Sequence, residues 1–206
     1  MAYAFPINTS KYMLGESFWT GAFTEEELDK IEKLGDSLEK VDAGVGVGEN
    51  SIVNPKVRTT DVSWIPSTDD NTWIFDKLGN VIKALNHDYY GFDLWGFEEA
   101  LQYSVYHETH DVGVAGHYDW HIDTVPASNL QPIFNGVRKL SISLQLSDFR
   151  DYEGGELWIH GQNKSCLTKK RGIIHCFPSF MLHRVTPVTV GIRKSLVAWI
   201  HGPSYR

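Results

Sequence analysis

A histidine and an aspartate with the chemistry to bind a metal ion stand two residues apart, as His121 and Asp123, near the end of an expected strand. Side chains two apart on a strand project from the same face, so an imidazole and a carboxylate converge there. A second histidine from a distant strand would complete a triad that leaves three positions open on an octahedral iron(II) ion. His183 is the candidate, because Pro178 and Ser179 turn the chain shortly before it.

An arginine and a serine follow the last residue of this triad in the chain, and their spacing from it suggests a binding site for a small molecule beside the metal ion. Arg193 stands ten residues after His183, and Ser195 comes two residues later. On a strand the two share a face and offer a guanidinium fork and a hydroxyl to one carboxylate. Together with the metal triad they predict a site for 2-oxoglutarate. Its oxo-acid end would chelate the iron, and its far carboxylate would meet Arg193.

A competing histidine–aspartate pair lies just upstream, at His117 and Asp119. Regular alternation places His117, Asp119 and His121 on one face of the same strand, so the strand pattern by itself leaves both pairs open as metal ligands. The remaining histidines, which are His107, His110, His160, His175 and His201, are interpreted as surface or hydrogen-bonded polar residues.

Two helices are expected in the first part of the chain. Thr24 and Glu27 form a capping-box pattern, and the apolar spacing that follows predicts a helix to about residue 41. A second helix is expected from near Asp70 to about Asn86. Between them, residues 43–54 form a glycine-rich connection that does not match a phosphate-binding loop, and residues 57–65 are expected to form a strand.

From residue 92 onward the pattern changes to short apolar runs separated by turn residues. Such runs are typical of a β-sandwich or barrel. We find no linker, repeat or low-complexity segment, so residues 1–206 are expected to form one domain, helical over about 1–91 and β-rich over about 92–203. The expected strands cover residues 101–106, 117–122, 140–146, 157–160, 173–177 and 195–201.

Composition limits the partners and the compartment. The net charge is −7 without a dense basic run, which disfavours nucleic acid as the main partner. The two cysteines, Cys166 and Cys176, lack metal or redox spacing, so reduced thiols in the cytoplasm are expected. There is neither a secretory signal pattern nor an apolar run of the roughly 18 residues needed to span a bilayer, so no membrane partner is expected.

Four ordered motifs resemble a known family. They are residues 118–123 (YDWHID), residues 152–157 (YEGGEL), residues 177–185 (FPSFMLHRV) and residues 191–196 (GIRKSL), followed by Trp199 and by Gly202 and Pro203. Together they resemble the prolyl 4-hydroxylase-like branch of the 2-oxoglutarate oxygenases, and above all the small bacterial and phage members described as PKHD-type hydroxylases. If the chain is encoded by a phage, the expected location is the host cytoplasm.

The resemblance implies a fold and a set of site residues. The fold would be mainly β with N-terminal helices (α+β), built on a double-stranded β-helix, or jelly-roll, core. The motif alignment favours the pair at His121 and Asp123 over the upstream pair, with His183 as the third ligand of Fe(2+) and Arg193 as the anchor of 2-oxoglutarate. Further implied co-substrate pocket residues are Tyr106, Gln145, Leu157, Ser195 and Trp199, and Arg58 is an implied substrate contact.

The resemblance also implies an activity. The enzyme would use O2 and 2-oxoglutarate to hydroxylate a C–H bond, most directly of a prolyl or other residue in a peptide or protein, with release of succinate and CO2. L-ascorbate (vitamin C) is an optional further cofactor. The carboxylate of Asp123 favours hydroxylation over halogenation. Alternatives are an oxygenase acting on a small molecule or on nucleic acid, and a cupin-type metal-binding protein without turnover. Nothing in the sequence predicts an oligomeric state.

Overall fold

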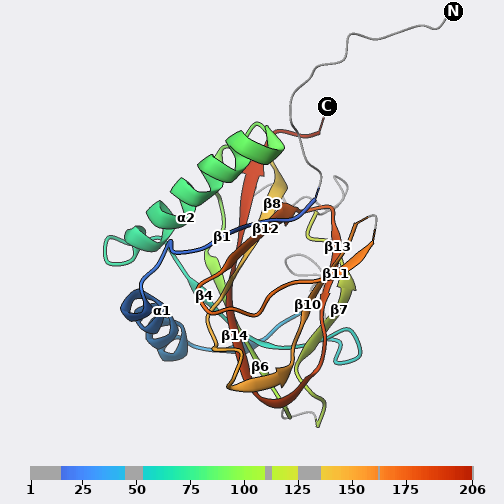
Figure 1. Ribbon diagram of the computed structural model, residues 1–206. Helices are drawn as coiled ribbons and strands as arrows, with labels where there is room; N and C mark the ends of the chain where they lie inside the picture. Colours follow the sequence, from blue (N-terminus) through green and yellow to red (C-terminus); the bar gives the residue numbers. More distant parts are fainter. Residues whose placement is uncertain (1–14, 45–52, 110–112, 125–135, 162, 206) are drawn as a thin grey trace, which may run out of the picture.

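The computed structural model describes residues 15–44, 53–109, 113–124, 136–161 and 163–205. This part of the chain is built on two antiparallel sheets (Figure 1). The larger sheet contains β1 (Ser17–Trp19), β2 (Val41–Asp42), β4 (Asp61–Ile65), β6 (Leu101–His107), β8 (Val137–Gln145), β12 (Ile174–Pro178) and β14 (Val188–Gly202), and β5 (Gly96–Phe97) and β9 (Tyr152–Gly154) pair with β14. The smaller sheet contains β3 (Arg58–Thr59), β7 (His117–His121), β10 (Leu157–His160), β11 (Lys164–Cys166) and β13 (Leu182–Val185).

Two helices, α1 (Glu25–Ser37) and α2 (Thr72–Leu85), lie on one side of the larger sheet, and the smaller sheet lies on the other side (Figure 1). Thr24 caps α1 with the predicted capping box, because its side chain accepts from the Glu27 amide while the Glu27 carboxylate accepts from the Thr24 amide. After α2 the chain continues as one π-helical turn, Asn86–Tyr90, and leaves it through Gly91 in the left-handed conformation.

The buried apolar side chains form two clusters. The larger one joins the helices to the outer face of the large sheet, as in Leu28, Leu78 and Leu140. The smaller one includes Tyr106, which comes from the larger sheet, and Leu157, which comes from the smaller sheet. Because two sheets each bury one face against the other, the space between them is the place in this fold where a site can be enclosed.

The predicted fold class, a mainly β protein with N-terminal helices and a jelly-roll core, is confirmed. Two boundaries were wrong. The first helix ends at Ser37, because Leu38 is extended and residue 41 already belongs to β2. The segment 57–65 is not one strand: it contributes β3 to the smaller sheet and β4 to the larger sheet, and the chain changes sheets at Thr60.

The other predicted β segments correspond to strands, although β14 is far longer than the predicted residues 195–201 because its N-terminal half pairs with β9 and β6. Most of the glycine-rich connection lies outside the described residues. The extent of a single domain over residues 1–206 stays a prediction. Among the described residues, no helix has both the length and the apolar character required to cross a membrane.

Candidate metal centre

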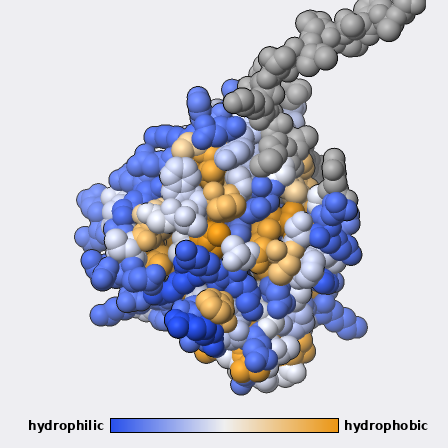
Figure 2. All heavy atoms as spheres, viewed as in Figure 1, coloured by the Kyte–Doolittle hydropathy of each residue, from blue (hydrophilic) through white to orange (hydrophobic). Residues whose placement is uncertain are grey.

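A cavity of about 470 Å³ lies between the two sheets and is lined by residues of both. Its wall contains apolar side chains such as Leu157 and Phe177, and three arginines, Arg58, Arg138 and Arg193, which also face it. Figure 2 shows that hydrophilic side chains predominate over the helical side, at left, whereas apolar side chains gather toward the middle of the face. Such a concave, partly apolar space with a few charged groups is the usual form of a small-molecule site.

The structure brings the three predicted metal ligands together in this cavity. His121 ends β7 and is the register partner of His183 on the neighbouring strand β13. Asp123 follows two residues after β7, where its amide donates to the Ser179 carbonyl at 2.9 Å. The Nε2 atoms of His121 and His183 lie 3.8 and 3.5 Å from the Asp123 carboxylate oxygens. All three candidate ligand atoms lie within 4.8 Å of one another.

Hydrogen bonds orient these side chains for ligation. Nδ1 of His121 donates to the Asp119 carbonyl at 2.7 Å, and Nδ1 of His183 donates to the Met181 carbonyl at 2.8 Å. Because a carbonyl oxygen only accepts, each ring holds its proton on Nδ1 and directs the lone pair of Nε2 toward the carboxylate. The hydroxyl of Ser141 donates to Asp123 Oδ2 at 2.7 Å. This is the donor set and tautomer pattern that a divalent metal ion requires.

The electrostatics keep His121 and Asp123 in the protonation states of metal ligands. Burial, and then the like charge of His183, lowers the pKa of His121 to about 3, so its imidazole is neutral at neutral pH. Burial acts to raise the pKa of Asp123, but the charges of His183, His121 and Arg138 and the Ser141 hydrogen bond outweigh it and lower that pKa to about 2. A neutral imidazole at His121 and an ionised carboxylate at Asp123 are the forms in which these side chains bind a metal(II) ion.

A bulge in β7 separates the two competing histidine–aspartate pairs. His183 lies opposite His121, whereas Val185 lies opposite Tyr118, so three residues of β7 span two of β13. The extra residue breaks the regular alternation that placed His117, Asp119 and His121 on one face, and that expectation was wrong. Tyr118 and His121 both line the cavity, whereas Asp119 is exposed. His117 donates from Nδ1 to the Ala115 carbonyl and does not line the cavity.

Arg193 lies on β14, in the sheet opposite the histidines, and is only 2% exposed. Its Nη1 donates to Ser195 Oγ at 3.2 Å, and its guanidinium carbon lies 5.2 Å from the centre of the Tyr106 ring. Its Nε is buried and has no hydrogen-bond partner, and no described carboxylate pairs with it. A buried cation without an anion is strongly unfavourable, so the guanidinium is arranged to receive one.

Residues 101–201 match the model of the 2OG-Fe(II) oxygenase superfamily. The match spans the segment from β6 through almost all of β14, which holds the triad and Arg193. This segment belongs to the 2OG-Fe(II) oxygenase superfamily. The family resemblance predicted from the four motifs is therefore confirmed.

Curated relatives of the chain are hydroxylases by name. The chain is similar to a PKHD-type hydroxylase of Synechococcus sp. strain CC9311, with 43% identity over 86 residues that cover 41% of this chain and 36% of that protein. It is also similar to the PKHD-type hydroxylase YbiX of Escherichia coli, with 40% identity over 88 residues that cover 40% of this chain and 37% of that protein. The matches thus span little more than a third of the length of these relatives.

Solved oxygenase structures share the fold over most of the chain. A prolyl-4-hydroxylase from Pseudomonas putida superposes with a TM-score of 0.69 at 16% identity and covers 92% of this chain and 94% of its own. A prolyl hydroxylase from Trichoplax adhaerens, in complex with a peptide fragment of hypoxia inducible factor, has a TM-score of 0.65 at 17% identity and covers 91% and 84%. At such identities the likeness shows the fold alone.

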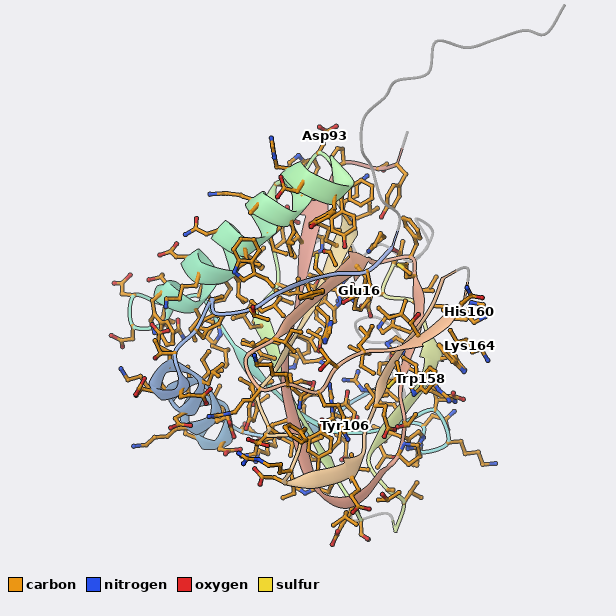
Figure 3. All side chains as sticks on the ribbon, in the orientation of Figure 1. Glu16, Asp93, Tyr106, Trp158, His160 and Lys164 are labelled. Atoms are coloured by element: carbon orange, nitrogen blue, oxygen red, sulfur yellow. The ribbon has the colours of Figure 1, made fainter. Side chains whose placement is uncertain are left out.

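The structure places most of the predicted pocket residues of this oxygenase fold on the cavity. Those that line it are Tyr106, Leu157, Ser195, Trp199 and the predicted substrate contact Arg58. Gln145 does not line it: its amide donates to the Tyr152 hydroxyl at 3.0 Å and to the Ser147 carbonyl at 3.1 Å. Figure 3 shows Tyr106 near the lower ends of β6 and β14, whereas His160 and Lys164 extend from the outer edge of the smaller sheet.

Sequence reasoning missed an ion pair in the cavity wall, formed by Glu99 and Arg138. Nε of Arg138 donates to Glu99 Oε1 at 2.7 Å, and the guanidinium stacks on Trp199 at 3.7 Å from its ring centre. His201 Nε2 lies 3.2 Å from the same Glu99 oxygen. No spacing along the chain relates Glu99 to Arg138, because Glu99 lies between β5 and β6 and Arg138 lies on β8, and these strands come together through β14.

The glycine in the YEGGEL motif also has a physical role near Arg193. Gly155 has a φ of +60°, a conformation that side-chain-bearing residues rarely adopt. A Cβ atom there would lie 2.9 Å from Cδ of Arg193. The motif thus leaves room for the buried arginine to pass toward the cavity.

Proposed function

We propose that this chain is an iron(II)- and 2-oxoglutarate-dependent oxygenase that hydroxylates a C–H bond, of which a prolyl residue in a peptide or protein is the first candidate. The observation that carries the proposal is that one cavity holds both a metal(II) donor set and, on the facing sheet, a buried arginine without an anion. A binder of metal alone has no need of the second feature.

Each group has a defined task in this proposal. His121, Asp123 and His183 would hold iron(II), and Arg193 with Ser195 would hold the far carboxylate of 2-oxoglutarate. When bound, iron and 2-oxoglutarate supply the means to activate O2 for hydroxylation, with succinate and CO2 as products. Ser141 keeps the Asp123 carboxylate oriented through its hydrogen bond.

The remaining wall of the cavity keeps water away from the reacting groups. Phe177, Leu157 and Val185 are buried apolar side chains on its lining. Removal of water strengthens the pairing between a guanidinium and a carboxylate. The Tyr106 ring beneath Arg193 adds a cation–π contact that helps to hold the fork in place.

The prolyl substrate is supported by the names of the solved neighbours, which are prolyl hydroxylases, one of them bound to a peptide. A small-molecule substrate is the second candidate, and the net charge of −7 disfavours nucleic acid. L-ascorbate as a cofactor and a cytoplasmic location stay predictions.

Arg193 provides the test of this proposal. We expect the wild-type protein to release succinate from 2-oxoglutarate with iron(II). In calorimetry with the redox-inert zinc(II) form, Arg193→Ala should weaken 2-oxoglutarate binding by about two to four decades, which corresponds to roughly 3–5 kcal/mol for breaking a buried charge pair. Arg193→Lys keeps the charge but loses the fork, so its affinity should be intermediate.

Zinc(II) affinity should stay the same in both variants, because Arg193 lies on the sheet opposite the histidines. The exposed Arg150, which pairs with the nearby Asp148, supplies a matched control as Arg150→Ala. If Arg193→Ala bound 2-oxoglutarate as tightly as the wild type, the co-substrate assignment would be wrong. A metal-binding protein without turnover would then be the better description.

A further inference from the structure

A second buried guanidinium, that of Arg58, lines the same cavity from the smaller sheet. Arg58 is 8% exposed and belongs to the two-residue strand β3, where it is the register partner of Tyr118 on β7. Its guanidinium carbon lies 4.5 Å from the centre of the Tyr118 ring, and that ring stacks on His121. Arg58 therefore stands beside the candidate metal centre.

The side chain of Arg58 has no partner in the part of the chain that the structure describes. Its Nε is buried without a hydrogen bond, and neither a hydrogen bond nor an ion pair joins its guanidinium to another described residue. Stacking on Tyr118 holds the plane of the group but satisfies none of its N–H donors. A five-donor cation is thus held in a wall of the cavity with none of its donors bound to a described residue.

The other charges around the cavity are already matched. Arg138 is paired with Glu99, and under the proposed function Arg193 receives 2-oxoglutarate while Asp123 receives the metal. Asp42 lies on the lining too, but it is exposed and forms no ion pair with Arg58. Among the described residues, Arg58 forms no ion pair, and it lies on the sheet opposite the one that carries the co-substrate anchor.

We propose that Arg58 binds a carboxylate of the prime substrate, so that this oxygenase selects acidic substrates. The inference rests on the proposed function and narrows its substrate class. A carboxylate fits better than a phosphate, because one guanidinium balances one negative charge, whereas a phosphate monoester carries about −1.5 to −2 at neutral pH. A planar fork also matches the two oxygens of a carboxylate.

The carboxylate could come from the C-terminus of a proline derivative or from an acidic side chain next to a proline. Two matched probe pairs distinguish these sources, and the members of each pair differ in one charged group. The first pair is N-acetyl-L-proline and N-acetyl-L-prolinamide. The second pair is N-acetyl-Glu-Pro-Gly-amide and N-acetyl-Gln-Pro-Gly-amide. Each is titrated by calorimetry into the zinc(II) form of the full chain with saturating 2-oxoglutarate.

We expect the wild-type protein to bind the acid of at least one pair about tenfold to hundredfold more tightly than its amide, as for a hydrogen-bonded charge in a buried site. Arg58→Gln should bind acid and amide equally, and Arg58→Lys should restore part of the preference. Arg150→Gln, which removes the same charge at an exposed position, should keep the full preference. The pair that discriminates identifies the source of the carboxylate.

The proposal would be overturned if the wild type bound neither acid more tightly than its amide, or if Arg58→Gln kept the preference of the wild type. It would also be overturned if Arg58→Gln lost 2-oxoglutarate affinity by tenfold, because Arg58 would then be a co-substrate residue. Zinc(II) and 2-oxoglutarate are titrated first into wild-type protein and every variant, which also verifies that each variant is folded. If the wild type did not bind 2-oxoglutarate, the proposed function would fail, and the acid preference would be measured in the zinc(II) form alone.

Discussion

At the scale of single residues, the candidate metal centre depends on which atoms of the two histidines carry protons. Both rings donate from Nδ1 to the carbonyl two residues earlier in the chain. The backbone therefore selects the tautomer, and no additional carboxylate is needed for this purpose. Asp123 is then the only anionic group of the triad, and it is 9% exposed and held by Ser141.

Replacing Asp123 tests the triad against the upstream pair. Asp123→Ala should weaken zinc(II) binding by more than about hundredfold, since even groups that only orient a ligand contribute tenfold to hundredfold. The matched control is Asp119→Ala, because Asp119 is exposed and belongs to the competing pair. Competition with a colorimetric chelator measures both affinities. Equal losses in the two variants, or a loss in Asp119→Ala alone, would refute the assignment.

At the scale of elements, α1 is fitted to the larger sheet at one glycine. Gly35 lies in the last turns of α1, where a Cβ would stand 2.4 to 2.6 Å from three ring carbons of Tyr103 on β6. The Tyr103 hydroxyl donates to Asp36 at 2.9 Å, so the ring is tied to the helix and cannot move aside freely. The absence of a side chain at Gly35 thus sets how closely the helix approaches the sheet.

Gly35→Ala should lower the free energy of unfolding by about 1–3 kcal/mol, because the added methyl group overpacks the contact with the Tyr103 ring. This cost outweighs the gain of about 1 kcal/mol from the higher helix propensity of alanine. Gly79 supplies the control, since it lies in α2 and a Cβ there would meet only Phe97, at 3.8 Å. Gly79→Ala should raise the free energy of unfolding by about 0.5–1 kcal/mol. Urea denaturation followed by circular dichroism measures both. Effects of the same sign in the two variants would contradict this packing.

At the scale of the whole molecule, ion pairs join α1 to the rest of the fold. Glu27 meets Lys77 of α2 at 2.6 Å, and Asp36 meets Lys194 of β14 at 2.7 Å. Burial acts to raise the pKa of Asp36, but its hydrogen bonds from Lys194 and Tyr103 and the charge of Lys194 lower the pKa overall. The hydrogen bond from Lys77 and the Thr24 amide lower the pKa of Glu27.

These shifts predict that the fold loses stability in acid. A carboxyl group whose pKa is lowered in the folded state stabilises the fold at pH values above its ordinary pKa, and this stability is lost as the pH falls below that pKa. The ordinary pKa is 4.5 for Glu27 and 3.8 for Asp36. The free energy of unfolding should therefore decline between pH 5 and pH 3, on the order of 1 kcal/mol for these partly exposed pairs. Denaturation in urea across this range measures the slope. Asp36→Asn should flatten it, and an unchanged slope in that variant would count against the pairing.

The predictions that succeeded were those that depend on neighbours along the chain. The capping box of α1, the short strands and the family motifs all rest on residue types at fixed, short spacings, which backbone geometry translates directly into local structure. The choice of His121, Asp123, His183 and Arg193 as candidates came from the two-residue period of a strand and from the ordered motifs, and their roles stay predictions. The structure has since brought the first three together.

What only the tertiary structure decided depends on which strands meet. The crossing of the chain between sheets at Thr60 brings Arg58 beside Tyr118, and the β7 bulge turns Asp119 outward, away from the cavity. Neither event leaves a local pattern, because each arises when backbone groups far apart in the chain compete for hydrogen-bond partners. The same holds for charge. The sequence contains seven arginines, and only the structure shows that Arg58, Arg138 and Arg193 line the cavity. Glu99 neutralises Arg138, whereas Arg58 and Arg193 face the cavity without an ion pair to any described carboxylate.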